Sequence, residues 1–322
     1  MKLNNKGFAF STMLYGALSL IIVVLLLVFN LLKNNTDETY YYSSIIEENL
    51  NKCVEEEIAL ENCYSSGSIN CDTTSYYACL GIKNNSVVES VRVIDLLKDK
   101  VVSSGNGLYE DSDGNLIFRG TTVNNYIQYS GDVWRIVEIE VNGSVKIAYT
   151  KYGKSLKWDV DDSSEWKVSS LNNELNNTFY ATLQNNTLIE QKNWRIGRIY
   201  DEASTLDELI FQESQVLYSN SLIGLLNASD YVKASLDASC KNDVLNSTSC
   251  TSWLSSYGGW VINASSTSEE ESAKAYYFKI GDKLSKKNVS DNENVIPVLY
   301  LKSTVRIVSG DGTLSNPYML ER

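Results

Sequence analysis

The sequence predicts a membrane-anchored α+β protein: a long N-terminal transmembrane helix, a disulfide-stapled helical stalk, and a mixed, mostly antiparallel α+β domain. Three observations lead to this prediction. The stretch 8–32 contains no charged residue, all six cysteines follow it, and short segments of alternating polarity begin near residue 101. The chain of 322 residues is 43% hydrophobic, so its exposed part can bury a core of its own.

Composition excludes several classes of function. The formal net charge is −12, and an acidic surface repels phosphate backbones, so we expect no nucleic-acid partner. The chain has no histidine, which excludes Ser-His-Asp and Cys-His catalysis and histidine-ligated zinc or haem. We therefore expect no cofactor, no metal ion and no enzyme activity.

The N-terminal apolar stretch is long enough to cross a membrane. From Phe8 to Leu32 it would span roughly 37 Å as a helix, more than the ~30 Å of a hydrocarbon layer. Lys2 and Lys6 precede it, whereas Asp37 and Glu38 follow it closely. This charge bias predicts a basic leader at 1–7, a single transmembrane helix at 8–33, a cytoplasmic N-terminus and an extracellular remainder.

The first eight residues resemble the leader of type IV prepilins: a short basic peptide, then Gly7, then Phe8 opening an apolar helix. The resemblance implies that a membrane prepilin peptidase cuts after Gly7 and leaves Phe8 as the new N-terminus. It also implies other pilin-like subunits as partners, in a surface filament. The family usually has Glu at the fifth mature position, where this chain has Thr12. A minor pilin therefore fits better than a major one, and a plain signal anchor and a cleaved secretory peptide are the alternatives.

A helical stalk is predicted over residues 34–100, where apolar residues recur at helical spacing after the membrane. An even number of cysteines outside the membrane predicts disulfides, and the spacings are wider than the Cys-x2-Cys pairs of zinc sites. Cys53 and Cys63 on one straight helix would lie about 15 Å apart, too far to bond. We therefore expect three bridges, the first two nested: Cys63–Cys71, Cys53–Cys79 and Cys240–Cys250.

The extracellular domain is predicted over residues 101–322. Its strands alternate with turn sequences such as Asp113-Gly114 and Asn142-Gly143. A helix is predicted over 171–183, where leucine and phenylalanine recur every fourth residue, and a weaker helix begins at Thr205. The predicted strands are 107–110, 116–119, 126–129, 133–137, 145–149, 215–226, 260–262, 276–280 and 295–302, with a closing strand and turn over 305–320.

Several stretches of this domain resemble an uncharacterised extracellular domain that is common on membrane-anchored proteins of low-GC Gram-positive gut bacteria. The resemblance covers roughly residues 104–320, and it implies a tryptophan-rich layout that is distantly C-type-lectin-like. The stretches that carry it are 105–111, 118–120, 124–127, 134–137, 297–301 and 310–318.

Three groups of residues have both a chemical and a structural interpretation. Asp111-Ser-Asp113-Gly-Asn115 begins like a calcium loop but lacks the later bidentate Glu, so we expect a hairpin turn. Carboxylates are plentiful, but no spacing singles out a pair for glycoside hydrolysis. Trp158, Trp166 and Trp253 lie in polar loops and are the candidates for ligand-facing aromatics, with burial in the core as the alternative.

The sequence therefore predicts a single-pass or pilin-like protein of the cell membrane that presents an extracellular binding or adhesion domain. Its surface ligand is unidentified, with a glycan as the leading class. The competing hypothesis is an anchored cell-wall or glycan hydrolase that uses carboxylates.

Overall fold

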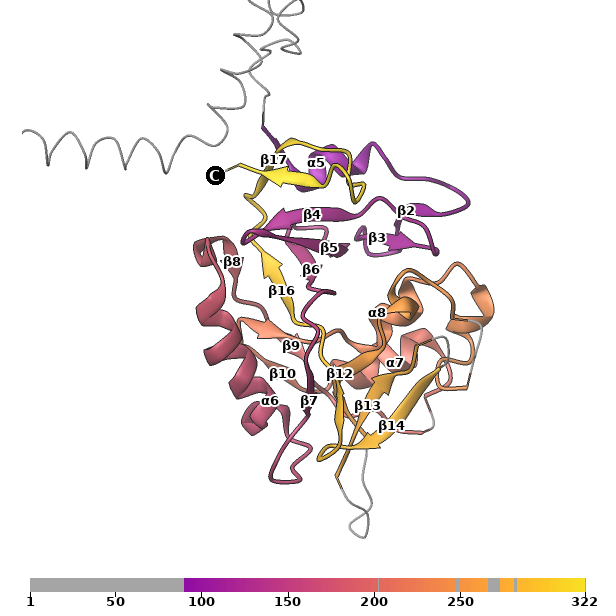
Figure 1. Ribbon diagram of the computed structural model, residues 1–322. Coiled ribbons are helices and arrows are strands. Elements are labelled where there is room, and N and C mark those ends of the chain that lie inside the picture. The colour runs from indigo at the N-terminus through magenta and orange to yellow at the C-terminus, as the bar shows by residue number, and fades with distance from the viewer. Residues whose placement is uncertain (1–89, 202, 247–249, 266–272, 281–282, 322) are drawn as a thin grey trace, which may run out of the picture. The chain divides into compact units, whose positions relative to one another are not determined.

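The computed structural model describes residues 90–201, 203–246, 250–265, 273–280 and 283–321. The predicted leader with Gly7 and Phe8, the transmembrane helix and most of the predicted stalk lie outside these ranges. So do four cysteines: Cys53, Cys63, Cys71 and Cys79. Within the described ranges, no helix has the length and apolar character needed to cross a membrane. The described part is a mixed α+β domain with a large, mostly antiparallel sheet, which confirms the predicted class of this domain (Figure 1).

The main sheet contains eleven strands within the described part of the chain. They are β1 (Val91–Arg92), β2 (Gly107–Glu110), β3 (Leu116–Arg119), β4 (Tyr126–Tyr129), β5 (Asp132–Ile139), β6 (Val145–Ala148), β8 (Ile189–Glu190), β11 (Ile223–Gly224), β16 (Val298–Leu301), β17 (Arg306–Ser309) and β18 (Tyr318–Leu320). The order is β1-β17-β18-β4-β5-β6-β16-β11, with β3 also on β5, β2 on β3 and β8 on β16. The pairing of β18 with β4 is parallel and the others are antiparallel.

Smaller elements complete the domain below and beside this sheet (Figure 1). The remaining strands form a three-stranded sheet, β12 (Gly259–Ala264), β13 (Lys274–Phe278) and β14 (Leu284–Asn288), and two pairs, β7 (Ser155–Lys157) with β15 (Asn292–Asn294) and β9 (Trp194–Arg195) with β10 (Leu217–Tyr218). The helices are α5 (Val93–Lys98), α6 (Ser170–Asn173), α7 (Leu206–Glu213) and α8 (Ala228–Lys233), the π-helix η2 (Glu174–Phe179), and the 3-10 turns η1 (Trp166–Val168), η3 (Tyr180–Thr182), η4 (Asn186–Leu188), η5 (Ala238–Lys241) and η6 (Leu254–Ser256).

The predicted meander between residues 107 and 149 is confirmed as strands β2 to β6. The β2–β3 hairpin pairs Glu110 with Leu116 and turns at Gly114, whose φ of 82° is readily adopted only by glycine. The short apolar segments of β3, β5 and β6 are buried, which explains why alternation and turn residues located them.

The helix predicted over 171–183 forms as three consecutive pieces, α6, η2 and η3. Its apolar positions Leu171, Leu175 and Phe179 are buried, as the spacing predicted. Ser169 caps its start by accepting a hydrogen bond from the backbone N–H of Asn172. Helix α7 begins after Thr205, which forms a capping box with Glu208, so the predicted start of this helix is also confirmed.

The strand predicted over 215–226 is wrong in its extent, because only the two-residue strands β10 and β11 form there. The side chain of Asn176 takes the place of a neighbouring strand. Its amide oxygen accepts from the backbone N–H groups of Leu222 and Ile223, and its amide nitrogen donates to the Ile223 carbonyl. A side chain thus satisfies backbone groups that a ladder would otherwise satisfy.

The domain begins before residue 101. Strand β1 pairs with β17, and Val93 and Leu97 of α5 are 1% and 0% exposed. Val93 and Leu97, which were predicted to belong to the stalk, therefore pack into the domain core.

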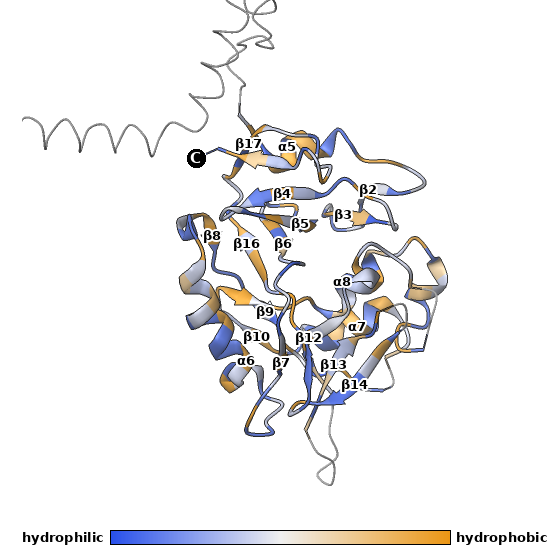
Figure 2. Ribbon diagram, in the orientation of Figure 1, coloured by the Kyte–Doolittle hydropathy of each residue, from blue (hydrophilic) through white to orange (hydrophobic). Residues whose placement is uncertain are grey.

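Figure 2 shows where apolar residues concentrate: β16 in the main sheet is largely hydrophobic, whereas β14 at the edge of the small sheet is hydrophilic. This distribution places the core between the main sheet and the elements that cover it.

Candidate functional site

A row of polar side chains crosses four strands of the otherwise apolar main sheet. Glu138 on β5 is the cross-strand partner of Lys146 on β6, Lys146 is the partner of Tyr300 on β16, and Tyr300 is the partner of Glu190 on β8. Cross-strand partners project from the same face of a sheet. The Lys146 side chain is fully buried and Glu138 is nearly so. The row therefore places charge inside the domain, where it must be matched by partners from another element.

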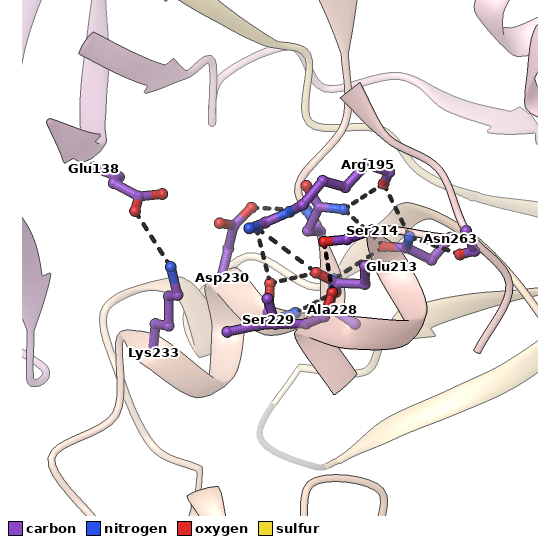
Figure 3. Close-up of polar contacts among 12 residues, drawn as sticks. Glu138, Arg195, Glu213, Ser214, Ala228, Ser229, Asp230, Lys233 and Asn263 are labelled. Atoms are coloured by element: carbon purple, nitrogen blue, oxygen red, sulfur yellow. Dashed lines mark hydrogen bonds and ion pairs between the residues drawn. The ribbon is translucent and has the colours of Figure 1, made fainter. Parts of the chain in front are cut away.

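Helix α8 supplies those partners. Asn227 starts the helix in a capping box with Asp230, and Asp230 and Lys233 are three residues apart, so they lie on the same side of α8. The Lys146 ammonium lies 2.6 Å from Asp230 Oδ2, and the Lys233 ammonium lies 3.3 Å from Glu138 Oε1. Figure 3 shows the second pair bridging from the helix to β5. Two ion pairs thus connect the polar row to α8.

A third ion pair lies beside them. Glu213, the last residue of α7, has no exposed side-chain surface and lies 3.7 Å from the guanidinium of Arg195. Ser229 donates to Glu213 through its backbone N–H at 2.8 Å and its hydroxyl at 2.6 Å. Asn263 donates to the Arg195 carbonyl and fixes the strand (Figure 3). We call Glu138, Lys146, Arg195, Glu213, Asp230 and Lys233 the charged centre.

Burial and neighbouring charges shift the pKa values of this centre in opposite directions. Burial raises the pKa of Glu213, and the nearby Arg195 guanidinium offsets this only in part. Burial also acts to raise the pKa of Asp230, but Lys146 and Arg195 outweigh it, so its pKa is lowered. Burial raises the pKa of the Tyr300 hydroxyl, helped by Glu138. Perturbed groups that adjoin a cavity are typical of functional sites.

Two cavities that share lining residues adjoin the charged centre, and together we call them the charged groove. The larger, about 550 Å³, is lined by the β2–β3 turn, the start of α7 and η5, and the smaller is about 220 Å³. Both cavities are lined by Asp113, Ile210 and Lys233. Glu138, Arg195 and Tyr300 line the smaller cavity, so the charged centre forms part of its wall. The combined space accommodates a ligand of one or two sugar units in size.

Two cations in the larger cavity have no ion-pair partner within the described part of the chain. They are Arg119 on β3 and Lys241 on η5. The Arg119 Nε is buried without a hydrogen-bond partner, and its guanidinium lies 5.2 Å from the Tyr109 ring centroid. Burial lowers the pKa of Lys241, and the nearby Arg119 charge lowers it further. Two adjacent cations in one cavity favour an anionic group between them.

The tryptophans predicted to face a ligand are instead in the core. Trp158, Trp166 and Trp253 are 0%, 2% and 2% exposed, so the prediction of ligand-facing positions is wrong. Two of the three indole N–H groups are satisfied by backbone carbonyls of distant strands, whereas the buried Trp166 Nε1 has no hydrogen-bond partner among the described residues. Trp158 Nε1 donates to the Val261 carbonyl and Trp253 Nε1 to the Phe118 carbonyl, so a polar loop can bury an indole at little cost.

Of the remaining predicted site residues, the structure describes only Cys240 and Cys250. Cys240 and Cys250 form the predicted disulfide, with Cα atoms 5.2 Å apart. Asp111 accepts hydrogen bonds from the backbone N–H groups of Asp113 and Asn115, so its oxygens serve the hairpin turn that we expected. Among the described residues, no cluster of three or more metal-ligating acidic or cysteine side chains is present.

The charged centre itself was missed by sequence reasoning. One signal could have located it: polar residues lie between buried apolar neighbours in β6 and β16, namely Lys146 and Tyr300, and in β5, namely Arg135 and Glu138. Comparison with models of known families, with curated proteins and with solved structures gives no match to this chain. The function is therefore argued from the site alone.

Proposed function

We propose that this protein is a membrane-anchored, pilin-like surface protein whose C-terminal domain binds an acidic glycan in the charged groove. The observation that carries the proposal is a pair of cations without an ion-pair partner among the described residues, Arg119 and Lys241, in a cavity that is also lined by the carboxylates of Glu110, Asp111, Asp113 and Asp207. A sugar carboxylate or sulfate would neutralise the two cations. Asp111 and Asp113 on the opposite loop can accept hydrogen bonds from sugar hydroxyls.

The charged centre supports this function by holding the groove in shape. Lys233 lies between two carboxylates, 3.3 Å from Glu138 and 4.0 Å from Asp111, so the α8 side chain is fixed before any ligand arrives. A preorganised wall costs less conformational entropy on binding. The expected C-type-lectin-like layout agrees with a sugar ligand, and it remains part of this proposal.

Binding to sialyllactose, with lactose as the matched neutral sugar, tests this function in the full chain purified in detergent. We expect sialyllactose to bind and lactose to bind much more weakly. Removing both cations by Arg119→Gln and Lys241→Gln should weaken binding by at least about tenfold, because a hydrogen bond to a charged group contributes about 1.5–3 kcal/mol. Lys302→Gln removes one exposed lysine outside the groove and serves as the control. Equal affinity for the two sugars, or unchanged affinity in the double variant, contradicts the proposal.

An anchored carboxylate hydrolase is the alternative. The groove carboxylates Asp111 and Glu138 share the Lys233 ammonium, and Glu213, whose pKa is raised, has no exposed side-chain surface. This arrangement favours binding over proton transfer to a substrate. Release of reducing sugar from peptidoglycan or mucin glycans, abolished by Glu138→Gln, would support the hydrolase instead.

Anchoring is tested at the N-terminus. If a prepilin peptidase processes the chain, N-terminal sequencing of the membrane-purified protein should begin at Phe8. An intact Met1, in cells with an active peptidase, would remove the pilin-like part of the proposal and leave a plain signal anchor.

A further inference from the structure

The Lys146–Asp230 pair differs from the other ion pairs of the domain in its burial. The ammonium and the carboxylate oxygen Oδ2 lie 2.6 Å apart, and the two side chains are 0% and 1% exposed. The two residues are 84 positions apart in sequence, on β6 and on α8. A nucleophilic amine and a carboxyl group are thus held in contact, in a space from which water is excluded.

The two oxygens of this carboxyl group are in different situations. Oδ2 accepts hydrogen bonds from Lys146 and, at 2.7 Å, from the backbone N–H of Asn227. Oδ1 is buried and has no hydrogen-bond partner among the described residues. A buried carboxylate oxygen without a partner is costly and needs an explanation. It is also the oxygen that could depart without breaking any hydrogen bond.

We propose that Lys146 and Asp230 condense into an intramolecular amide bond that covalently joins β6 to α8. In this step Lys146 Nζ bonds to Asp230 Cγ, and the bond from Cγ to Oδ1 breaks. Two protons from the ammonium leave with Oδ1 as one water molecule, and the third stays on the amide nitrogen. Oδ2 becomes the amide oxygen and keeps the hydrogen bond from Asn227. No oxidant, cofactor or second substrate is consumed.

The neighbouring cations lower the pKa of Asp230 and favour its ionised form, so the reaction begins with a proton transfer within the pair. Moving one proton along the 2.6 Å hydrogen bond converts the ions into a neutral amine and a carboxylic acid, the forms that react. A low-dielectric interior penalises the separated charges and so reduces the cost of this transfer. Glu138 is the cross-strand neighbour of Lys146 and is nearly buried, but its carboxylate pairs with Lys233 at 3.3 Å, so the proton moves within the Lys146–Asp230 pair itself.

Peptide mapping of the full chain, reduced and digested with trypsin, tests the bond directly. An amide at Lys146 blocks cleavage there, so we expect peptide 136–151 joined to peptide 199–233, with a mass lower than their sum by one water. The Lys192–Glu140 pair is an internal control, because its atoms are 2.5 Å apart but its side chains are 16% and 25% exposed. Trypsin should cleave normally after Lys192, and peptide 168–192 should be recovered without a link to peptide 136–151.

Two variants distinguish loss of the amide bond from loss of folding. Lys146→Arg keeps the positive charge but removes the primary amine, so its digest should contain only unlinked peptides. Asp230→Leu removes the carboxyl group, so its digest should also contain only unlinked peptides, and near-ultraviolet circular dichroism shows whether each variant still folds. Full recovery of unlinked peptides 136–146 and 199–233 from the wild-type protein would overturn the proposal, whatever the variants do. A failure of sugar binding would leave this result untouched.

Discussion

One face of the β5–β6 strand pair is aromatic and the other is charged. On the aromatic face Trp134 stacks on Tyr149 with ring centroids 4.9 Å apart, and Phe179 packs against both. On the charged face Glu138 and Lys146 are cross-strand partners. Aromatic contacts are stabilised by burial itself, whereas buried ion pairs must first overcome the loss of hydration. Removing one partner of a buried ion pair should therefore cost more stability than a conservative change on the aromatic face.

A single extra residue in β5 separates the aromatic part of the ladder from the charged part. Ile136 pairs with Ile147, and the next pair is Glu138 with Lys146, so Val137 is an insertion in the ladder. Such a bulge changes the face to which the following side chains point. Without it, Val137 would lie opposite Lys146, and the ammonium would lose its carboxylate neighbour on this sheet.

The largest expected effect is on the charged face. Lys146→Met leaves the Asp230 carboxylate buried without its ammonium, and we expect a loss of about 3–5 kcal/mol in the free energy of unfolding. Adding Asp230→Leu should recover part of this loss, because an apolar pair needs no hydration. Urea denaturation of the single and double variants measures both values. A single variant as stable as the wild type would mean that the charged face contributes nothing to the fold.

A smaller effect is expected on the aromatic face. Phe179 is 5% exposed, and Phe179→Leu keeps most of its volume, so the loss should be under about 1.5 kcal/mol. The same urea titration measures it. If this variant lost more stability than Lys146→Met, the roles assigned to the two faces would have to be exchanged.

The faces should also differ in their response to pH. Because the folded-state pKa of Glu213 is raised above its ordinary value of 4.5, its contribution to stability is present below that value and is lost as pH rises through the folded pKa. Glu213→Gln should therefore remove the decline in unfolding free energy above pH 4.5. Phe179→Leu should shift the whole pH curve without changing its slope, and a changed slope there would contradict the assignment.

The smallest effect is expected at the edge of the aromatic face. Lys154 pairs with Glu174 at 3.2 Å, but the lysine side chain is 48% exposed. Water and salt screen such a pair, so Lys154→Gln should change the unfolding free energy by less than about 1 kcal/mol. A thermal melt at two salt concentrations measures this change, and a large salt-dependent loss would show that the exposed pair matters more than its position indicates.

The sequence located most regular elements because their signals are local. Alternating apolar residues and glycine turns marked β2 to β6, and Thr205 with Glu208 marked the start of α7. The Cys240–Cys250 bridge also followed from short spacing around a polar loop. These features depend on residues that are close together in the sequence, so one sequence is enough to predict them.

The charged centre depends instead on long-range pairing. Lys146 and Asp230 are 84 positions apart, and nothing near either residue indicates the other. The prediction for the tryptophans was wrong for a related reason. Trp253 lies in a polar loop but is buried, and its indole N–H donates to the distant backbone carbonyl of Phe118. Burial of a loop residue depends on what folds over it, and local composition does not report this.

The pairing at the ends of the domain has a consequence for its biosynthesis. Strands β17 and β18 come last in the chain, yet they lie between β1 and β4, which come first. The earliest strands therefore cannot complete the sheet while residues 306–320 are still being made. A growing chain would expose the edge of β4 until then, and an exposed edge can pair with other chains. We expect this domain to depend on chaperone protection until its last strands are released from the ribosome.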